Sequence, residues 1–247
     1  MTAELLEMVE IRHHRLHVRT AARTHRRTSE ESFMLQAIFW DNDGVLVDTE
    51  ELFFASNREV MAEHGVDLDH ELFAEWSLRR GKSVFDMLED TSPAEREALR
   101  DERNRRYELL LRAGVRQFPG AQQCLASLHG QLPMAVVTSA YPDHFDIIHE
   151  QTEMMQYMEF VLKGGDYDRH KPYPDPYLMA AEKQGVDPAH CLVIEDSERG
   201  LVAAVAAGMR CIVIPNPLAR DADLSSAHAI VPSIDAVPEI VARLSER

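Results

Sequence analysis

Short apolar runs recur along the second half of the chain, and a stretch with helical character follows each of them. The runs lie at 134–137, 160–162, 191–194 and 211–214, an earlier one lies at 35–40, and a possible edge strand lies at 229–231. Helices are expected at about 142–151, 174–184, 199–207 and 234–244. Short apolar strands that alternate with helices predict a parallel sheet covered by helices on both faces.

Between the first apolar run and the others, the pattern is helical throughout. A helix is expected at 50–64, before Gly65, and a long charged helix at 93–113, with Ser92 as its N-cap and Gly114 as its stop. The interval therefore looks like a helical module inserted into an α/β core. We place the module at 51–118 and the core at 34–50 and 119–247.

The first 33 residues differ from the rest in charge. Residues 11–28 contain six arginines, four histidines and no acid, whereas the whole chain has a formal net charge of -16 at pH 7. We expect 1–33 to be an N-terminal extension without organised structure. The functional alternative is a basic arm or a targeting segment.

Charge and composition narrow the class of partner. A strongly acidic chain repels phosphate backbones, so we expect no nucleic-acid partner. No apolar run approaches the roughly 20 residues needed to span a bilayer, so we expect no membrane partner. The three cysteines, Cys124, Cys191 and Cys211, form no C-x-x-C pair and fit the reduced cytoplasm. We expect a cytoplasmic protein that acts on a small molecule, and nothing in the sequence demands more than a monomer.

Polar residues follow the predicted strands at the edge where parallel sheets bind ligands. They are Asp41 and Asp43, Thr138 and Ser139, and Glu195 and Asp196, and Lys171 lies in the loop ahead of the helix at 174–184. Asp41 and Asp43 would share a face of an extended backbone, and Gly44 allows a sharp turn after them.

Carboxylates crowded in this way need a cation, and Mg2+ prefers such hard oxygen ligands. Lys171 would add positive charge, and Thr138 and Ser139 would add neutral donors. Phosphoryl transfer requires mainly positioning and charge neutralisation, so this residue set predicts a phosphotransfer site.

Four segments, in order, resemble the motifs of the haloacid dehalogenase superfamily. They are Asp41-Asn42-Asp43-Gly44-Val45-Leu46-Val47-Asp48-Thr49-Glu50, Val137-Thr138-Ser139, Lys171-Pro172-Tyr173-Pro174-Asp175-Pro176, and Ile194-Glu195-Asp196-Ser197-Glu198-Arg199-Gly200. The group with the most similar pattern contains the beta-phosphoglucomutases and sugar-phosphate phosphatases. The resemblance implies a Rossmann-like parallel-sheet core with an inserted all-helical cap domain, which closes over the substrate.

The resemblance also implies residue roles. Asp41 would attack phosphorus to form an aspartyl phosphate, and Asp43 would act as the acid and then the base. Thr138, Ser139 and Lys171 would bind the phosphoryl group. Mg2+ would be held by Asp41, the backbone carbonyl of Asp43 and Asp196, with Glu195 nearby or coordinating.

The choice of activity depends on a few positions. The acid at Asp43 favours phosphate esters over the dehalogenase and phosphonate reactions. Family mutases usually have a histidine where this chain has Phe53, and a serine and lysine where it has Ala140 and Tyr141. We therefore expect a phosphatase that acts on a small phosphorylated metabolite, with a phosphohexomutase as the alternative. A non-catalytic binding module is a further alternative, although both aspartates are intact.

Other polar residues have weaker signals. Arg79, Arg80 and Lys82 flank Gly81 in the helical module and could contact the distal part of an anionic substrate, or could form a solvated charge run. Asp48 is expected to fix the loop after the first strand. The four histidines at 64, 144, 149 and 170 are expected at the surface.

Overall fold

A computed structural model describes residues 34–216 and 222–246, so the expectations for residues 1–33 lie outside the described residues. The core is a six-stranded sheet in the order β5-β4-β1-β6-β7-β8, and every neighbouring pair is parallel. The strands are β1 (Ala37–Trp40), β4 (Met134–Val137), β5 (Phe160–Leu162), β6 (Cys191–Glu195), β7 (Arg210–Val213) and β8 (Ala229–Ile230). The predicted parallel sheet is confirmed, and β8 forms one of its edges.

Alternate residues of each strand pack into two separate cores, as the pleat of a strand dictates. In β1, Ile38 and Trp40 belong to one core, and Ala37 and Phe39 belong to the other. All four are completely buried. This two-sided burial explains why the strands read as continuous apolar runs and not as alternating ones.

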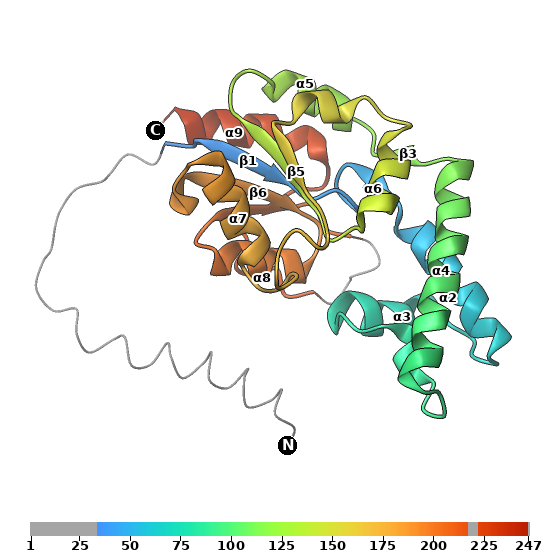
Figure 1. The fold of residues 1–247 in the computed structure, drawn as a ribbon. Helices are drawn as coiled ribbons and strands as arrows, with labels where there is room; N and C mark the ends of the chain where they lie inside the picture. The colour runs from blue at the N-terminus through green and yellow to red at the C-terminus, as the bar shows by residue number, and fades with distance from the viewer. Residues whose placement is uncertain (1–33, 217–221, 247) are drawn as a thin grey trace, which may run out of the picture. The chain divides into compact units, whose positions relative to one another are not determined.

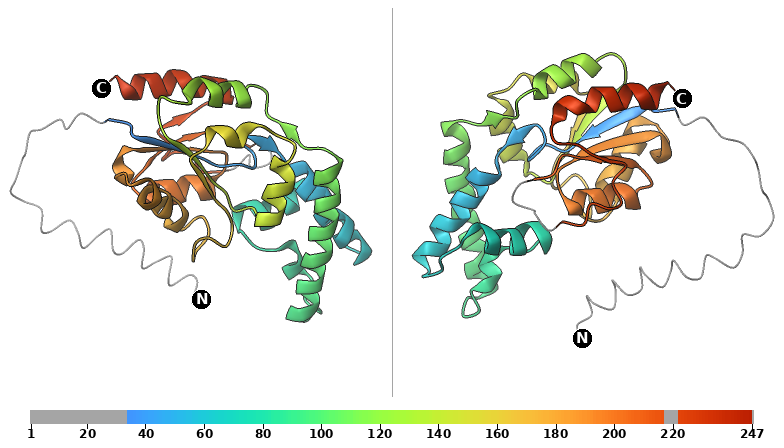
Figure 2. Two further views of the ribbon diagram at one scale, coloured as in Figure 1. Left: turned by 45° about the horizontal axis from the view of Figure 1, so that its top comes forward. Right: turned by 180° about the vertical axis from the view of Figure 1, so that it is seen from behind.

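Helices cover both faces of the sheet (Figure 2). One core includes residues of α5 (Ala121–Leu128), α6 (Pro142–His149) and α9 (Val237–Ser245). The other includes residues of α7 (Asp175–Gln184) and α8 (Glu198–Ala206). Helix α5 was not among the predicted helices, although its buried residues at 121, 124, 125 and 128 have helical spacing.

Figure 1 shows the elements of the helical module. They pack around a third core, which includes Phe54, Met61, Phe73 and Phe85. The module's elements are α2 (Glu50–Glu63), α3 (His70–Phe73), the π-helix η2 (Ala74–Arg79), the 3-10 helix η3 (Val84–Met87) and α4 (Pro93–Ala113). Helix α4 begins with a capping box at Ser92 and ends at Gly114, as predicted.

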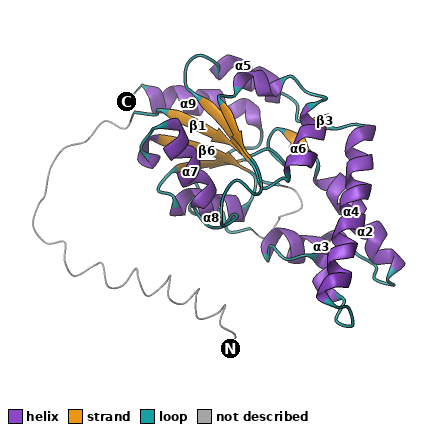
Figure 3. Cartoon of the chain, viewed as in Figure 1, coloured by secondary structure: helices purple, strands orange, loops and turns teal. Residues whose placement is uncertain are grey.

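A small antiparallel pair, β2 (Val47–Asp48) and β3 (Arg116–Gln117), lies where the chain enters and leaves the helical module (Figure 3). Two-residue strands leave no periodic signal, so the sequence did not predict them. Arg116 donates a hydrogen bond to the Asp48 carboxylate across this pair. Asp48 therefore contributes to the structure of the loop, as expected.

None of the helices in the described part of the chain has both the length and the apolar character needed to cross a membrane.

Candidate active site

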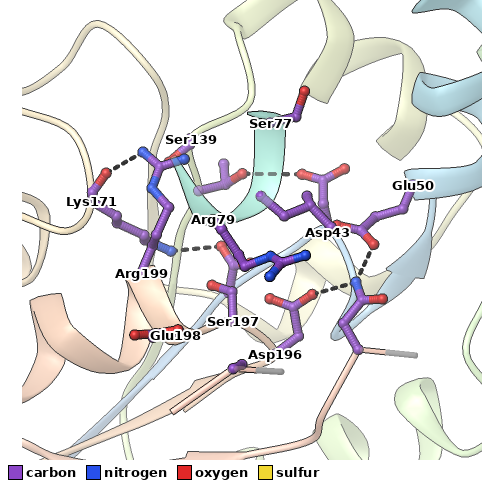
Figure 4. Close-up of a pocket in the computed structure, with 15 residues that line it drawn as sticks. Asp43, Glu50, Ser77, Arg79, Ser139, Lys171, Asp196, Ser197, Glu198 and Arg199 are labelled. Atoms are coloured by element: carbon purple, nitrogen blue, oxygen red, sulfur yellow. Dashed lines mark hydrogen bonds and ion pairs between the residues drawn. The ribbon is translucent and has the colours of Figure 1, made fainter. Parts of the chain in front are cut away.

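The neighbouring strands β1, β4 and β6 end side by side, because Trp40 pairs with both Val136 and Ile194. The residues that follow these strands meet around a cavity of about 160 Å³ (Figure 4). Seven of the predicted site residues line it: Asp41, Asp43, Thr138, Ser139 and Asp196 at these strand ends, Lys171 from the loop before α7, and Arg79 from the helical module. Segments 155 residues apart in the sequence are thus brought to one place, since Asp41 and Asp196 line the same cavity.

Lys171 holds the first aspartate of the cluster. Its buried ammonium donates to Asp41 Oδ1 at 2.7 Å, to Glu195 Oε1 at 2.7 Å and to the carbonyl of Val137 at 2.9 Å. Burial alone would lower the pKa of Lys171, but the two carboxylates reverse this effect and raise it above its ordinary value. Lys171 is therefore a permanent cation at this position.

Glu195 is fixed beneath the cavity by several donors. Besides Lys171, its carboxylate accepts hydrogen bonds from the Tyr177 hydroxyl at 2.7 Å and the Ser197 hydroxyl at 3.0 Å. Burial would raise the pKa of Glu195, but the Lys171 ammonium holds it below its usual range. Gly200 is necessary here, because a Cβ at that position would lie 1.8 Å from Glu195 Cδ. Sequence reasoning missed Tyr177 and Gly200 as supports of this carboxylate.

Asp43 is held by three side-chain donors. Its Oδ1 accepts from the Thr49 hydroxyl at 2.5 Å, and its Oδ2 accepts from the Thr138 hydroxyl and the Asn42 amide, each at 3.3 Å. The Thr138 hydroxyl in turn accepts from the backbone N–H of Ala140 at 3.0 Å. Asp43 thus faces the cavity in a defined orientation, two residues after Asp41.

Asp196 is linked to a second acid through Asn216. The Asn216 amide donates to Asp196 Oδ2 at 3.0 Å and to Glu50 Oε2. Burial raises the pKa of Glu50 to about 7, although the bond from Asn216 opposes this rise. Glu50 and Asn216 both line the cavity, and sequence reasoning assigned a role to neither. Glu50 is the last residue of the first motif, so its place in that motif could have indicated a role at the site.

The donor set fits a divalent cation. In the described part of the chain, Asp41, Glu195 and Asp196 each offer a carboxylate oxygen, and these oxygens lie within 4.8 Å of one another. Burial raises the pKa of Asp41 to about 8 and that of Asp196 well above its ordinary value, so a cation would stabilise their ionised forms. Oxygen-only ligands are the kind that Mg2+ prefers.

The cap residues that were predicted to contact substrate divide into two groups. Arg79 lines the cavity together with Ser77 (Figure 4). Arg80, however, donates to Glu75 Oε1 at 2.7 Å with its guanidinium over the Trp76 ring, and the exposed Lys82 does not line the cavity.

A cation from the core also lines the cavity. Arg199 donates to the backbone carbonyl of Lys171, and a Cβ at Gly81 would lie only 2.7 Å from Arg199 Cζ. The glycine of the cap loop therefore lies directly against this guanidinium. The sequence pass did not assign Arg199 a role.

The expectation for the histidines is wrong for two of them. His64 and His170 are exposed, but His144 is buried and His149 is half-buried. Both exceptions lie on α6, whose inner face packs in the core next to the site. His149 Nε2 lies 2.8 Å from Asn42 Oδ1, in the loop that carries the two aspartates.

Comparison with known proteins adds to this geometry. A family described as "Haloacid dehalogenase-like hydrolase" matches residues 38–214. The chain is 29% identical over 180 residues to fructose-1-phosphate phosphatase YqaB of Escherichia coli (strain K12), which covers 71% of this chain and 94% of that protein. It is 31% identical over 198 residues to hexitol phosphatase B of the same strain, which covers 76% of this chain and 86% of that protein.

A solved structure is similar as well. The crystal structure of CbbY from Rhodobacter sphaeroides in complex with phosphate aligns with a TM-score of 0.70 and 26% sequence identity, over 81% of this chain and 95% of that one. The similarity therefore extends over most of the α/β core and the helical module together.

Proposed function

The chain belongs to the haloacid dehalogenase-like hydrolases, and from this premise we propose that it is a Mg2+-dependent phosphatase that hydrolyses a small phosphomonoester through an aspartyl phosphate on Asp41. One observation carries the proposal: Asp41 is held by Lys171 at 2.7 Å while Asp43 faces the same cavity. The fructose-1-phosphate and hexitol phosphatases among the relatives support a sugar phosphate as the substrate class.

The chemistry divides into two steps. In the first, a carboxylate oxygen of Asp41 bonds to phosphorus, the ester bond breaks, and Asp43 gives its proton to the departing oxygen. In the second, Asp43 takes a proton from water, whose oxygen bonds to phosphorus and releases Asp41 and inorganic phosphate. Lys171, Thr138 and Ser139 would donate hydrogen bonds to the phosphoryl oxygens.

Asp41, Asp196 and the backbone carbonyl of Asp43 would hold Mg2+, which when bound would neutralise charge on the acids and on the phosphoryl group. We assign Glu195 mainly to Lys171, because its carboxylate already accepts hydrogen bonds from Lys171, Tyr177 and Ser197. Its removal would therefore disturb the lysine first.

Residues 51–118 would form the cap, and Arg79 would contact the part of the substrate distal to the phosphate. Arg79 is the one of the three predicted cap cations that lines the cavity. All three cysteines are free and buried, which supports the assignment to a reducing cytoplasm.

A mutase is not favoured by the residues of the cap. At the position where mutases of this family usually have a histidine, Phe53 packs edge-on against Tyr107 and Phe73, with ring centroids 5.2 Å and 6.1 Å away. An apolar ring cannot exchange a proton with a sugar hydroxyl.

The test compares Asp41→Asn with a control, Asp90→Asn, at an exposed position. Release of phosphate from p-nitrophenyl phosphate and from a panel of hexose phosphates is measured with Mg2+ and with EDTA. We expect Asp41→Asn to lose at least about a thousandfold in kcat, since the nucleophile is removed, and the control to retain activity. Parent-like turnover by Asp41→Asn would exclude the proposed nucleophile.

A further inference from the structure

A polar residue separates the two aspartates, and its side chain is fully buried. Asn42 has 0% exposure, and its amide joins two groups. Its Nδ2 donates to Asp43 Oδ2 at 3.3 Å, and its Oδ1 lies 2.8 Å from His149 Nε2. The histidine comes from α6, 107 residues further along the chain. A buried amide with partners on both sides has a defined orientation.

His149 is held on its other sides as well. Its Nδ1 lies 2.7 Å from the Thr152 hydroxyl, and its ring packs against Phe145 with a centroid distance of 4.3 Å. Burial, together with the nearby Lys163 ammonium, lowers the pKa of His149 to about 4. The imidazole is therefore neutral near pH 7 and carries a single N–H.

The donors and acceptors available determine the direction of each hydrogen bond from Thr152 through His149 and Asn42 to Asp43. Asn42 turns its N–H toward Asp43 Oδ2, at 3.3 Å, and its oxygen toward His149 Nε2, at 2.8 Å. That oxygen needs a donor, so His149 carries its proton on Nε2. Nδ1 is then an acceptor and takes the hydrogen bond of the Thr152 hydroxyl. The opposite tautomer would place the Nε2 lone pair against the Asn42 oxygen.

We propose that Asn42, oriented by His149, is a positioning residue that holds the Asp43 carboxylate for proton transfer to the leaving oxygen. The inference rests on the proposed function, because it assigns a purpose to the acid and base role of Asp43. Neither Asn42 nor His149 touches the substrate in this scheme. Their effect reaches the reaction only through the orientation of Asp43.

This role has a consequence that a merely structural role lacks. A poor leaving group, such as a sugar alkoxide, requires a proton from Asp43, whereas p-nitrophenolate leaves without one. Misplacing a catalytic group by about 1 Å can cost on the order of a hundredfold in rate. Loss of the His149 hydrogen bond should therefore lower kcat/KM, which reports the step that releases the leaving group, much more for a sugar phosphate than for p-nitrophenyl phosphate. Hydrolysis of the aspartyl phosphate is common to both substrates and does not enter this comparison.

The experiment compares His149→Leu, which removes the donor, with His149→Gln, which keeps an N–H in reach of Asn42. His228→Leu, at an exposed position, is the control. For the hexose phosphate that the wild type hydrolyses best, we expect His149→Leu to lower kcat/KM about tenfold or more. With p-nitrophenyl phosphate, kcat/KM should fall less than about threefold, and His149→Gln should recover most of the loss of kcat/KM on the hexose phosphate.

Three results would overturn the inference: parent-like kinetics of His149→Leu, equal losses on both substrates, or no recovery in His149→Gln. If circular dichroism shows that His149→Leu does not fold, Thr152→Val replaces it. This variant removes the hydroxyl that donates to His149 Nδ1, and it should show a smaller difference of the same kind between the hexose phosphate and p-nitrophenyl phosphate. Asp43→Asn separates this inference from the proposed function. If Asp43→Asn hydrolyses the sugar phosphate at the parent rate, the assignment of Asp43 fails; if it does not and His149→Leu is parent-like, only the positioning role fails.

Discussion

Replacement of Gly44 by alanine tests how closely the aspartate loop must approach Asp196, which directly follows β6. Gly44 has a φ of +81°, and a Cβ there would lie 2.0 Å from Asp196 Oδ2. Ordinary contact begins at 3.4 Å, so the carboxylate or the loop must shift by about 1.4 Å. The Asp196 carboxylate cannot move freely, because it accepts a hydrogen bond from Asn216 at 3.0 Å.

The chain contains a matched control. Gly65 has a φ of +76° and would have no atom within 4 Å of an added Cβ. Alanine at either position should cost about 1 kcal/mol of the free energy of unfolding, since a left-handed backbone disfavours a side chain. Only Gly44→Ala should also displace Asp196.

The assays are chemical denaturation and the dependence of kcat/KM on Mg2+ concentration. We expect Gly44→Ala to lose about a hundredfold in kcat/KM and to require more Mg2+, while Gly65→Ala keeps the parent values. If both variants show the same activity and the same Mg2+ dependence, the close approach of Gly44 to Asp196 has no bearing on the site.

Three further predictions follow from the contacts. Lys171→Met leaves the buried carboxyls of Asp41 and Glu195 without their cation and should lower the free energy of unfolding, measured in urea, by about 3–5 kcal/mol. Lys183→Met, at an exposed position, is the control, and a loss below about 1 kcal/mol in Lys171→Met would contradict the reasoning. Arg79→Gln should raise KM for the sugar phosphate about tenfold with kcat retained, whereas Arg80→Gln should stay within about twofold, and equal effects would remove Arg79 from the substrate site. The pKa of His149 falls from 6.5 to about 4 on folding, so between these pH values the unfolded chain binds a proton that the folded chain does not. The contribution of His149 to the free energy of unfolding should therefore be complete above pH 6.5 and should decrease by about 3 kcal/mol as the pH falls to 4. His149→Gln should lack this decrease when unfolding is measured as a function of pH.

Much of the site could be predicted because its polar residues directly follow strands. A run such as 191–194 identifies a buried strand, and a parallel sheet brings the ends of its strands to one edge. The placement of Asp41, Thr138 and Asp196 around one cavity then follows from topology, without knowledge of any side-chain contact.

The contacts between distant side chains could not be predicted in this way. Tyr177 meets Glu195, and His149 meets Asn42, through the tertiary packing of α7 and α6, and no local pattern shows which helix residue reaches the strand end. Both hydrogen bonds depend on how a helix is rotated on the sheet. A single sequence specifies that rotation only through its apolar face.

The cap shows a different limit. The backbone N–H of Arg80 bonds to the carbonyl of Glu75, five residues earlier, because η2 is a π-helix. The usual 3.6-residue spacing therefore misplaces the side chains that follow. Arg79 and Arg80 both form ion pairs with Glu75, at 3.2 Å and 2.7 Å, but of the two Arg79 also lines the cavity, a distinction that α-helical periodicity could not make.

The alternation of β1 does not stop at its last residue. Phe39 and Trp40 face opposite cores, and the next two residues keep the same order: Asp41 meets Lys171, which precedes α7, and Asn42 meets His149 of α6. An insertion or deletion of one residue in this strand would therefore exchange the partners of the two side chains as well as the two cores. We therefore expect the segment from β1 to Asn42 to accept substitutions but neither insertions nor deletions.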